Sequence, residues 1–205
     1  AQTLREWSPQ PVEGCTNILM MHQSIDPYIY SPLEPPSLKL NELPEGFDII
    51  INGHLHSHLM EKIGNTIFFI PGSTVTTQME RTEAEIPKGI MQITIANKPE
   101  VKFVPLENNR KFFYEEIKLV SSKTLRDQVE AKINDALFKK TFSKLPLFKV
   151  KISGNENEVI DGELKELQKK YFGRAIVVFS KDLESPEITS KMEFLRNMIE
   201  QKSSV

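Results

Sequence analysis

Short apolar runs dominate the first half of the chain, and they are typical of strands. Residues 17–21 and 48–51 are each too short for a typical helix, and the second run is rich in β-branched isoleucine. The second run ends at Asn52-Gly53 and is apolar on both faces, as the central strands of parallel sheets are. The pattern therefore predicts two buried strands, with 48–51 at the centre of a sheet.

Two hairpins are expected to follow. Residues 61–63 and 66–70 flank a Gly-Asn turn, and the alternating segments 89–95 and 101–106 flank a second turn. We expect the second hairpin to close the sheet of the first half. The polar segment 80–88 between the hairpins is expected to be the most disordered stretch in this half.

Strand and helix patterns alternate in the second half of the chain. The elements expected are a strand at 113–119, a helix from Ser121 or Ser122 to about Lys140, a strand at 147–152, a helix at 157–172 and a strand at 175–179. Apolar residues recur at helical spacing on one face of each helix. They are Leu125, Val129, Ile133 and Leu137 in the first helix, and Val159 or Ile160, Leu164, Leu167 and Tyr171 in the second. A small βαβαβ domain is therefore predicted.

The end of the chain predicts an amphipathic helix. Ser185 is suited to cap it, and Pro186 to occupy its first turn. One apolar stripe then contains Ile188, Met192, Leu195 and Ile199. This face could pack on its own domain or lie in the groove of a partner.

These elements place the chain in the α/β class. The domains expected are 1–107, 111–182 and a tail at 183–205, with 108–110 as a linker. The 205 residues are 39% hydrophobic, which allows one or two buried cores. The single cysteine, Cys15, excludes an internal disulfide framework. The sequence contains no apolar span of about twenty residues and no signal peptide pattern, so we expect a soluble protein.

Histidines follow both predicted central strands. His22 follows 17–21, and His54 and His56 follow 48–51 after the Gly53 turn. Ligands bind beyond the carboxyl ends of strands in open α/β sheets, and imidazole nitrogens suit zinc, manganese or iron. The sequence thus predicts a metal site formed by these three residues, while His58 is expected to be structural or exposed to solvent. The alternative is a surface turn with incidental histidines.

Charge is unevenly distributed, although the net charge is only −2. Residues 1–106 carry seven Lys or Arg against twelve Asp or Glu, whereas 110–151 carry eleven against five. A basic second domain is suited to a phosphate backbone, because cationic side chains release the counterions condensed there. A solvated, charge-rich surface without a nucleic-acid partner is the other interpretation.

Three motifs together resemble a known family. They are His22-Gln23, Gly53-His54-Leu55-His56 and Ile70-Pro71-Gly72-Ser73, which occur in the order of the C-terminal half of a calcineurin-like metallophosphoesterase β-sandwich domain. The segment 112–117 and the region after it narrow the resemblance to the meiotic-recombination "eleven" type double-strand-break repair nucleases, relatives of bacterial SbcD. The resemblance covers about residues 15–180.

The resemblance implies a site, a cofactor and partners. His22 and His54 would ligate one Mn²⁺ ion and His56 a second, with Gln23 and Ser73 near the ligands or the phosphate. The βαβαβ domain would be a capping domain that contacts DNA, with Lys149 and Lys151 as candidate contacts. The tail 183–205 would bind an SMC-like repair ATPase, and the full-length form would be a homodimer. A cytoplasmic protein is implied, associated with the chromosome if the source is prokaryotic, with no membrane attachment.

The sequence also departs from this family. The upstream Asp-x-His, Gly-Asp and Gly-Asn-His-Asp motifs that supply the remaining metal ligands do not occur. We therefore expect a portion of a longer exonuclease and endonuclease, with weak or no two-metal binding and no nuclease activity by this polypeptide alone. The alternatives are a noncatalytic module that binds DNA or a partner, and a small-molecule phosphodiesterase.

Overall fold

The computed structural model describes residues 2–31, 33–119, 124–155 and 161–184. The chain divides into two compact units between Asn109 and Arg110. Each unit has its own hydrophobic core. The mixed α/β class predicted from the sequence is confirmed.

A four-stranded sheet forms the centre of the first unit. Its strands are β1 (Ile18–Met21), β4 (Ile49–Asn52), β6 (Thr66–Ile70) and β5 (Leu59–Ile63), in that spatial order. The strands β1, β4 and β6 run parallel, and β5 pairs antiparallel with β6. The predicted central strand and the first predicted hairpin are thus confirmed.

One cluster of buried apolar residues in the first unit lies on one face of this sheet. Leu19, Ile50 and Phe68 are neighbours across β1, β4 and β6, and all are buried. Two very short strands cover them, β2 (Ile25–Asp26) and β3 (Leu38–Lys39), and the 3₁₀ helix η1 (Leu40–Glu42) follows. The helix α1 (Gln2–Trp7) precedes the sheet, and its Leu4 packs against the same core. Two-residue strands carry no periodic signal, and they were not predicted.

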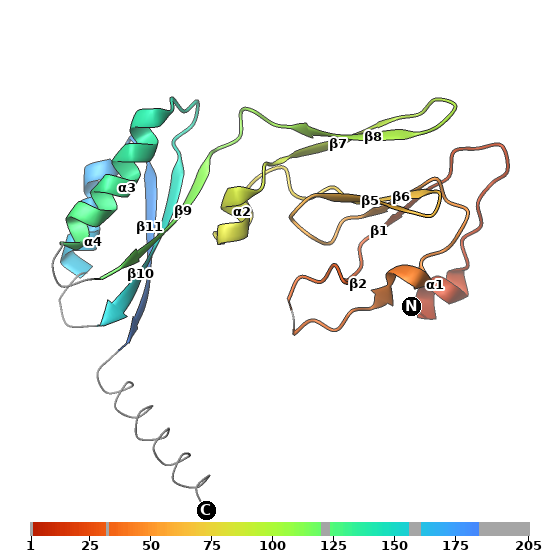
Figure 1. Ribbon diagram of the computed structural model, residues 1–205, viewed down its shortest axis with the longest axis horizontal. Helices are drawn as coiled ribbons and strands as arrows, with labels where there is room; N and C mark the ends of the chain where they lie inside the picture. The colour runs from red at the N-terminus through yellow and green to blue at the C-terminus, as the bar shows by residue number, and fades with distance from the viewer. Residues whose placement is uncertain (1, 32, 120–123, 156–160, 185–205) are drawn as a thin grey trace, which may run out of the picture. The chain divides into compact units, whose positions relative to one another are not determined.

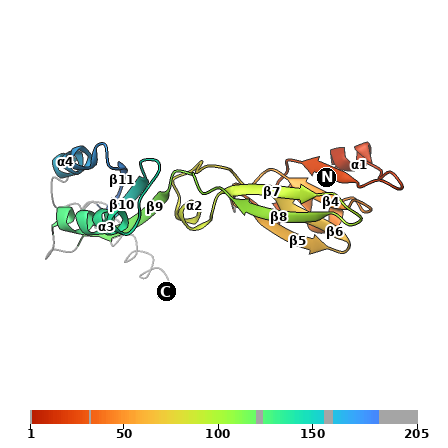
Figure 2. The same cartoon turned by 90° about the horizontal axis from the view of Figure 1, so that it is seen from above.

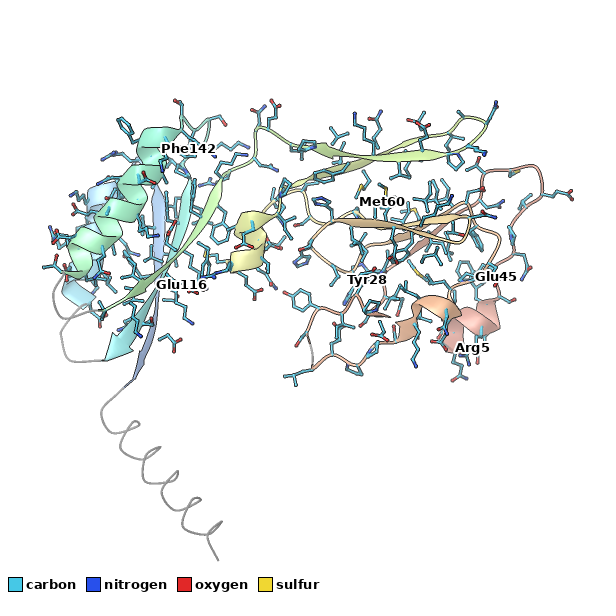
Figure 3. All side chains as sticks on the ribbon, viewed as in Figure 1. Arg5, Tyr28, Glu45, Met60, Glu116 and Phe142 are labelled. Atoms are coloured by element: carbon cyan, nitrogen blue, oxygen red, sulfur yellow. The ribbon has the colours of Figure 1, made fainter. Side chains whose placement is uncertain are left out.

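Tyr28 fastens the covering segment to the sheet. Its ring stacks on Phe68 with the centroids 5.9 Å apart, and its hydroxyl donates a 2.7 Å hydrogen bond to Glu61. Tyr28 and Met60 lie on opposite faces of the sheet (Figure 3). Burial, followed by the bond and the negative charge of Glu61, raises the pKa of Tyr28 to about 12.

Tyr28→Phe is expected to change the stability of the first unit in alkali. The folded state holds the Tyr28 proton more tightly than the unfolded chain, in which the pKa is 10.0. The contribution of this proton is fully present below pH 10 and is lost as pH rises towards 12. Urea unfolding from pH 9 to 12 should therefore show the wild type losing its advantage over the variant. A constant difference across that range would contradict the raised pKa of Tyr28 in the folded state.

The second predicted hairpin packs on the sheet and does not close it. Its strands are β7 (Gly89–Thr94) and β8 (Glu100–Pro105), which form a separate two-stranded sheet. The hairpin lies over the sheet in a second layer (Figure 1). The Phe103 ring of the hairpin stacks on the His58 ring, with the ring centroids 3.7 Å apart. Contacts between side chains replace the ladder of backbone hydrogen bonds that was predicted. The finer assignment to a metallophosphoesterase sandwich stays a prediction.

The segment 80–88 is ordered, contrary to the prediction of disorder. It contains α2 (Arg81–Glu85), and both Glu83 and Lys88 are buried. These two side chains form an ion pair at 3.3 Å, which gives the buried charges the partner that they require. Two of the charged side chains in this segment are therefore buried and paired inside the protein. The sequence pattern alone does not reveal this.

The second unit has the predicted βαβαβ arrangement. Its elements are β9 (Phe112–Lys118), α3 (Leu125–Lys139), β10 (Leu147–Asn155), α4 (Asp161–Tyr171) and β11 (Ile176–Glu184). The three strands are parallel in the order β11-β10-β9, and both helices cover one face of the sheet (Figure 2). The predicted stripe residues Val129, Ile133, Leu167 and Tyr171 are fully buried there. Burial of each aliphatic side chain contributes about 1.5–3 kcal/mol.

The ends of the predicted helices differ or lie outside the described residues. Thr124 caps α3, because its Oγ1 accepts a 3.2 Å hydrogen bond from the Asp127 amide. Ser121, Ser122, Val159 and Ile160 lie outside the described residues, and so does the tail at 185–205 with Ile188, Met192, Leu195 and Ile199. None of the helices that the structure describes is long and apolar enough to span a bilayer.

Candidate metal centre

His22 and His54 lie side by side at the ends of adjacent parallel strands. β1 and β4 pair up to Met21 and Asn52, and the two histidines follow from there. Their ring centroids are 5.4 Å apart in an edge-to-face arrangement. A Cβ atom at Gly53 would lie 3.0 Å from the His22 Nδ1 atom, so the glycine leaves room for this ring. The parallel pairing of β1 with β4 therefore places two of the three predicted ligands together.

Tyr30 connects His56 with this pair. The Tyr30 ring centroid lies 5.7 Å from that of His56 and 6.4 Å from that of His54. The three histidines and Tyr30 thus form one continuous cluster of rings. His58 has a different ring contact, because it stacks on Phe103.

Asn52 holds the His22 segment against β4. Its side chain is fully buried, accepts a 2.8 Å hydrogen bond from the Gln23 amide, and donates another of 2.8 Å to the Gln23 carbonyl. Both polar groups of the Asn52 amide are used, as buried groups require. The backbone of the predicted site residue Gln23 is therefore held by two hydrogen bonds with Asn52. The Gln23 side chain accepts a 3.0 Å hydrogen bond from the Ser37 hydroxyl.

A carboxylate from the β2–β3 connection reaches His54. Glu34 Oε1 lies 3.0 Å from His54 Nε2, and Glu34 Oε2 accepts a 3.1 Å hydrogen bond from the Tyr30 amide. The hydrogen bond with His54 is the largest influence on the pKa of Glu34 and lowers it, partly offset by burial. The Glu34 carboxylate therefore lies beside the imidazoles as a possible oxygen ligand, and the sequence did not suggest it.

His56 is connected to a buried ion pair through Thr77. The His56 Nδ1 atom lies 2.8 Å from Thr77 Oγ1, which lies 2.9 Å from Glu83 Oε1. Glu83 also accepts a 2.9 Å hydrogen bond from the Thr77 amide and pairs with Lys88. Burial alone would raise the pKa of Glu83, but the hydrogen bonds from Thr77 and the charge of Lys88 outweigh it and hold the pKa below its usual value.

The backbone of His56 is held by the same ion pair. Lys88 donates to the His56 carbonyl at 3.1 Å and to Ser73 Oγ at 2.9 Å. The Ser73 amide donates to the same carbonyl at 3.0 Å, and the Ser73 hydroxyl donates to the Val75 carbonyl at 2.8 Å. Ser73, predicted to lie near the ligands or the phosphate, supports the His56 main chain.

These donors are suited to a divalent metal but do not enclose one. Imidazole and carboxylate groups are common ligands of Mn²⁺ and Zn²⁺. Within the ranges that the structure describes, no three or more His, Cys, Asp or Glu side chains are placed to hold an ion. The described side chains therefore do not form a metal site by themselves, and an ion at this cluster would need further ligands.

The residues that support His56 were missed in the sequence. Thr77, Glu83 and Lys88 lie in a loop and a polar segment with no regular pattern, so nothing local marks them. Asn52 could have been suspected, because a polar residue that ends an apolar strand needs a hydrogen-bond partner in the sheet.

The candidate DNA contacts lie in the second unit, on the sheet face away from the helices. Lys151 forms a 2.7 Å ion pair with Asp182, and the hydrogen bond and charge of this carboxylate raise the pKa of Lys151. The Lys149 ammonium lies 5.9 Å from the Tyr114 ring centroid. The carboxylate of Asp182 offsets the charge of Lys151. Lys149 is therefore the stronger candidate of the two.

Comparisons with known proteins agree with the motifs. No family model matches the chain. It is 33% identical over 115 residues to the double-strand break repair protein mus-23 of Neurospora crassa, with 54% of this chain and 15% of that protein covered. It is 28% identical over 206 residues to the double-strand break repair protein MRE11 of Oryza sativa, with 84% of this chain and 27% of that protein covered.

An archaeal relative extends this similarity. The DNA double-strand break repair protein Mre11 of Thermoplasma acidophilum is 32% identical over 87 residues, which cover 42% of this chain and 23% of that protein. The chain thus spans about a quarter or less of the length of these relatives. The resemblance that its motifs indicated is confirmed: the chain is similar, over part of its length, to double-strand break repair proteins of the Mre11 type.

Proposed function

We propose that this chain contributes part of the active centre and the capping domain of a manganese-dependent DNA nuclease that processes double-strand breaks. The observation that carries the proposal is the cluster of His22, His54 and His56 at adjacent strand ends, in a chain homologous to repair proteins. Hydrolysis of phosphodiesters by metal ions requires ligands held in place before the substrate arrives. Parallel strands provide such support.

The proposed roles follow the positions of the side chains. His22 and His54 would hold one Mn²⁺ ion and His56 the other, and two bound ions supply a nucleophile from water and stabilise the leaving oxygen. Asn52 keeps the His22 segment on β4, and the Thr77-Glu83 pair supports His56. The ligands that the cluster lacks would come from Asp-x-His, Gly-Asp and Gly-Asn-His-Asp motifs outside this sequence.

DNA and protein partners belong to the same proposal. The open face of the second unit would contact the phosphate backbone, with Lys149 as the first residue to test. The tail at 183–205 would bind an SMC-like repair ATPase, and the full-length protein would act as a homodimer with exonuclease and endonuclease activity. Homology to double-strand break repair proteins supports this assignment.

The direct experiment compares two polypeptides in a DNA cleavage assay with Mn²⁺. One is the 205-residue chain, and the other is the product of the whole gene that encodes it. We expect activity only from the longer product, and only if it carries the upstream ligand motifs. Mn²⁺-dependent cleavage by the 205-residue chain would contradict the need for those ligands. A longer product without these motifs and without activity would favour a noncatalytic DNA-binding or partner-binding module, and cleavage of small phosphodiesters alone would favour a phosphodiesterase.

A further inference from the structure

The hydrogen-bond chain beside His56 contains one hydroxyl proton with two possible acceptors. Thr77 Oγ1 lies 2.8 Å from His56 Nδ1 and 2.9 Å from Glu83 Oε1. A threonine hydroxyl donates a single proton, whereas an ionised carboxylate can only accept. The protonation of Glu83 therefore decides which way this chain of hydrogen bonds runs.

The surroundings of Glu83 favour its ionised form. Its side chain is only 5% exposed and lies 3.3 Å from the ammonium of Lys88, whose side chain is 7% exposed. Glu83 Oε2 also accepts a 2.9 Å hydrogen bond from the Thr77 amide. The loss of the negative charge would leave Lys88 as an uncompensated buried cation, which is strongly unfavourable. Thr77 thus donates its proton to Glu83, and its oxygen is left to accept one from His56.

We propose that Glu83 and Thr77 are positioning residues that hold His56 in the tautomer protonated on Nδ1, with the Nε2 lone pair free for a cation. Histidines that bind metals generally donate their other N–H to a protein acceptor, which fixes both ring orientation and tautomer. The tautomer follows from the contacts among His56, Thr77, Glu83 and Lys88 and does not depend on the proposed function. The identity of the cation rests on the proposed function.

Lys88 couples the ring of His56 to its main chain. Its ammonium contacts Glu83 on one side and the His56 carbonyl, at 3.1 Å, on the other. The backbone of His56 and the acceptor for its ring are therefore attached to the same buried ion pair. We expect both the position and the tautomer of this imidazole to be set before any ion binds.

The test measures the tautomer without metal. Long-range ¹H–¹⁵N correlation spectra of the 205-residue chain, recorded at about pH 8.5, distinguish the two nitrogens of each neutral histidine. In the wild type we expect His56 to carry its proton on Nδ1. In Glu83→Gln, the amide oxygen should stay towards the Thr77 amide and Lys88, so that the amide nitrogen donates to Thr77 Oγ1. The hydroxyl then donates to His56 Nδ1, and the tautomer is expected to reverse to Nε2–H.

Further variants keep the test decisive if Glu83→Gln does not fold. Thr77→Val removes the hydroxyl and should abolish the preference for Nδ1–H. Thr77→Ser keeps the hydroxyl and should keep the preference. Thr74→Val, in the same loop, is the control and should leave it unchanged. Nε2–H on His56 in the wild type, or an unchanged tautomer in folded Glu83→Gln or Thr77→Val, would overturn the proposal.

The Mn²⁺ affinity of the same variants separates the tautomer from the proposed function. Loss of the acceptor is expected to weaken Mn²⁺ binding at His56 by about 10–100-fold. If the tautomer changes as expected while Mn²⁺ affinity stays constant, the positioning role stands and the metal-binding role of His56 is removed.

Discussion

Asn52→Asp is expected to lower the free energy of unfolding of the first unit by about 3 kcal/mol or more at neutral pH. The substitution keeps the shape of the side chain but removes the donor to the Gln23 carbonyl, which lies 2.8 Å away. It also introduces a negative charge at a position with no exposed surface. Urea unfolding followed through the amide signals of β1 and β4 measures the effect in this unit.

The effect of Asn52→Asp should also depend on pH. Burial next to a carbonyl raises the pKa of the introduced carboxyl above its usual value of about 3.9. The deficit is therefore fully present above the raised pKa and shrinks as pH falls through it, because the protonated carboxyl can donate to Gln23 again. Asn65→Asp, in an exposed turn, is the control and should stay within about 0.5 kcal/mol of the wild type. Equal stability of the two variants would contradict the role of Asn52.

Gly72→Ala is expected to destabilise the first unit by about 2–4 kcal/mol and to displace the His56 backbone. Gly72 has a φ angle of +72°, and an added Cβ would lie 2.8 Å from the His58 amide nitrogen and 3.0 Å from the His56 carbonyl oxygen. These are backbone atoms, so the conflict cannot be relieved by turning a side chain. Unfolding in urea gives the free energy, and chemical-shift changes at residues 56–58 report the displacement.

Gly64→Ala is the matched control for this prediction. Gly64 also has a positive φ angle, of +60°, but a Cβ there would meet nothing within 4 Å. Only the cost of the left-handed conformation remains, which is about 1–2 kcal/mol. If Gly64→Ala were as destabilising as Gly72→Ala, the close approach of Gly72 to the His56 loop would have no energetic importance.

The parts of the fold that depend on local pattern could be predicted. The isoleucine run of β4 buries Ile49 and Ile50 and leaves Ile51 partly exposed. The predicted stripe of α3 buries Leu125, Val129 and Ile133, and its Leu137 is partly buried. The βαβαβ order of the second unit follows from the alternation of such segments. In the first unit, the two-residue strands and the layered position of the β7–β8 hairpin depend on contacts between distant residues, and no window of sequence contains that information.

In the candidate site too, the residues marked by a local pattern could be predicted and those placed by long-range contacts could not. The histidines could be found because each follows a recognisable strand, and the pairing of β1 with β4 then brings His22 and His54 together. The support of His56 could not be found, because Thr77 lies 21 residues from it and Lys88 lies 32 residues from it. Glu83 and Lys88 look like surface charges in the sequence, and only the structure shows that they are paired and buried.

A titration of the 205-residue chain with Mn²⁺, followed through the side-chain NMR signals of its four histidines, tests the central claim most directly. Mn²⁺ is paramagnetic and broadens the signals of nuclei close to it, even when binding is weak. The account predicts that His22, His54 and His56 lose intensity at Mn²⁺ concentrations that leave His58, stacked on Phe103, largely unaffected. Parallel loss at all four histidines, or loss at His58 first, would contradict a metal centre at the ends of β1 and β4.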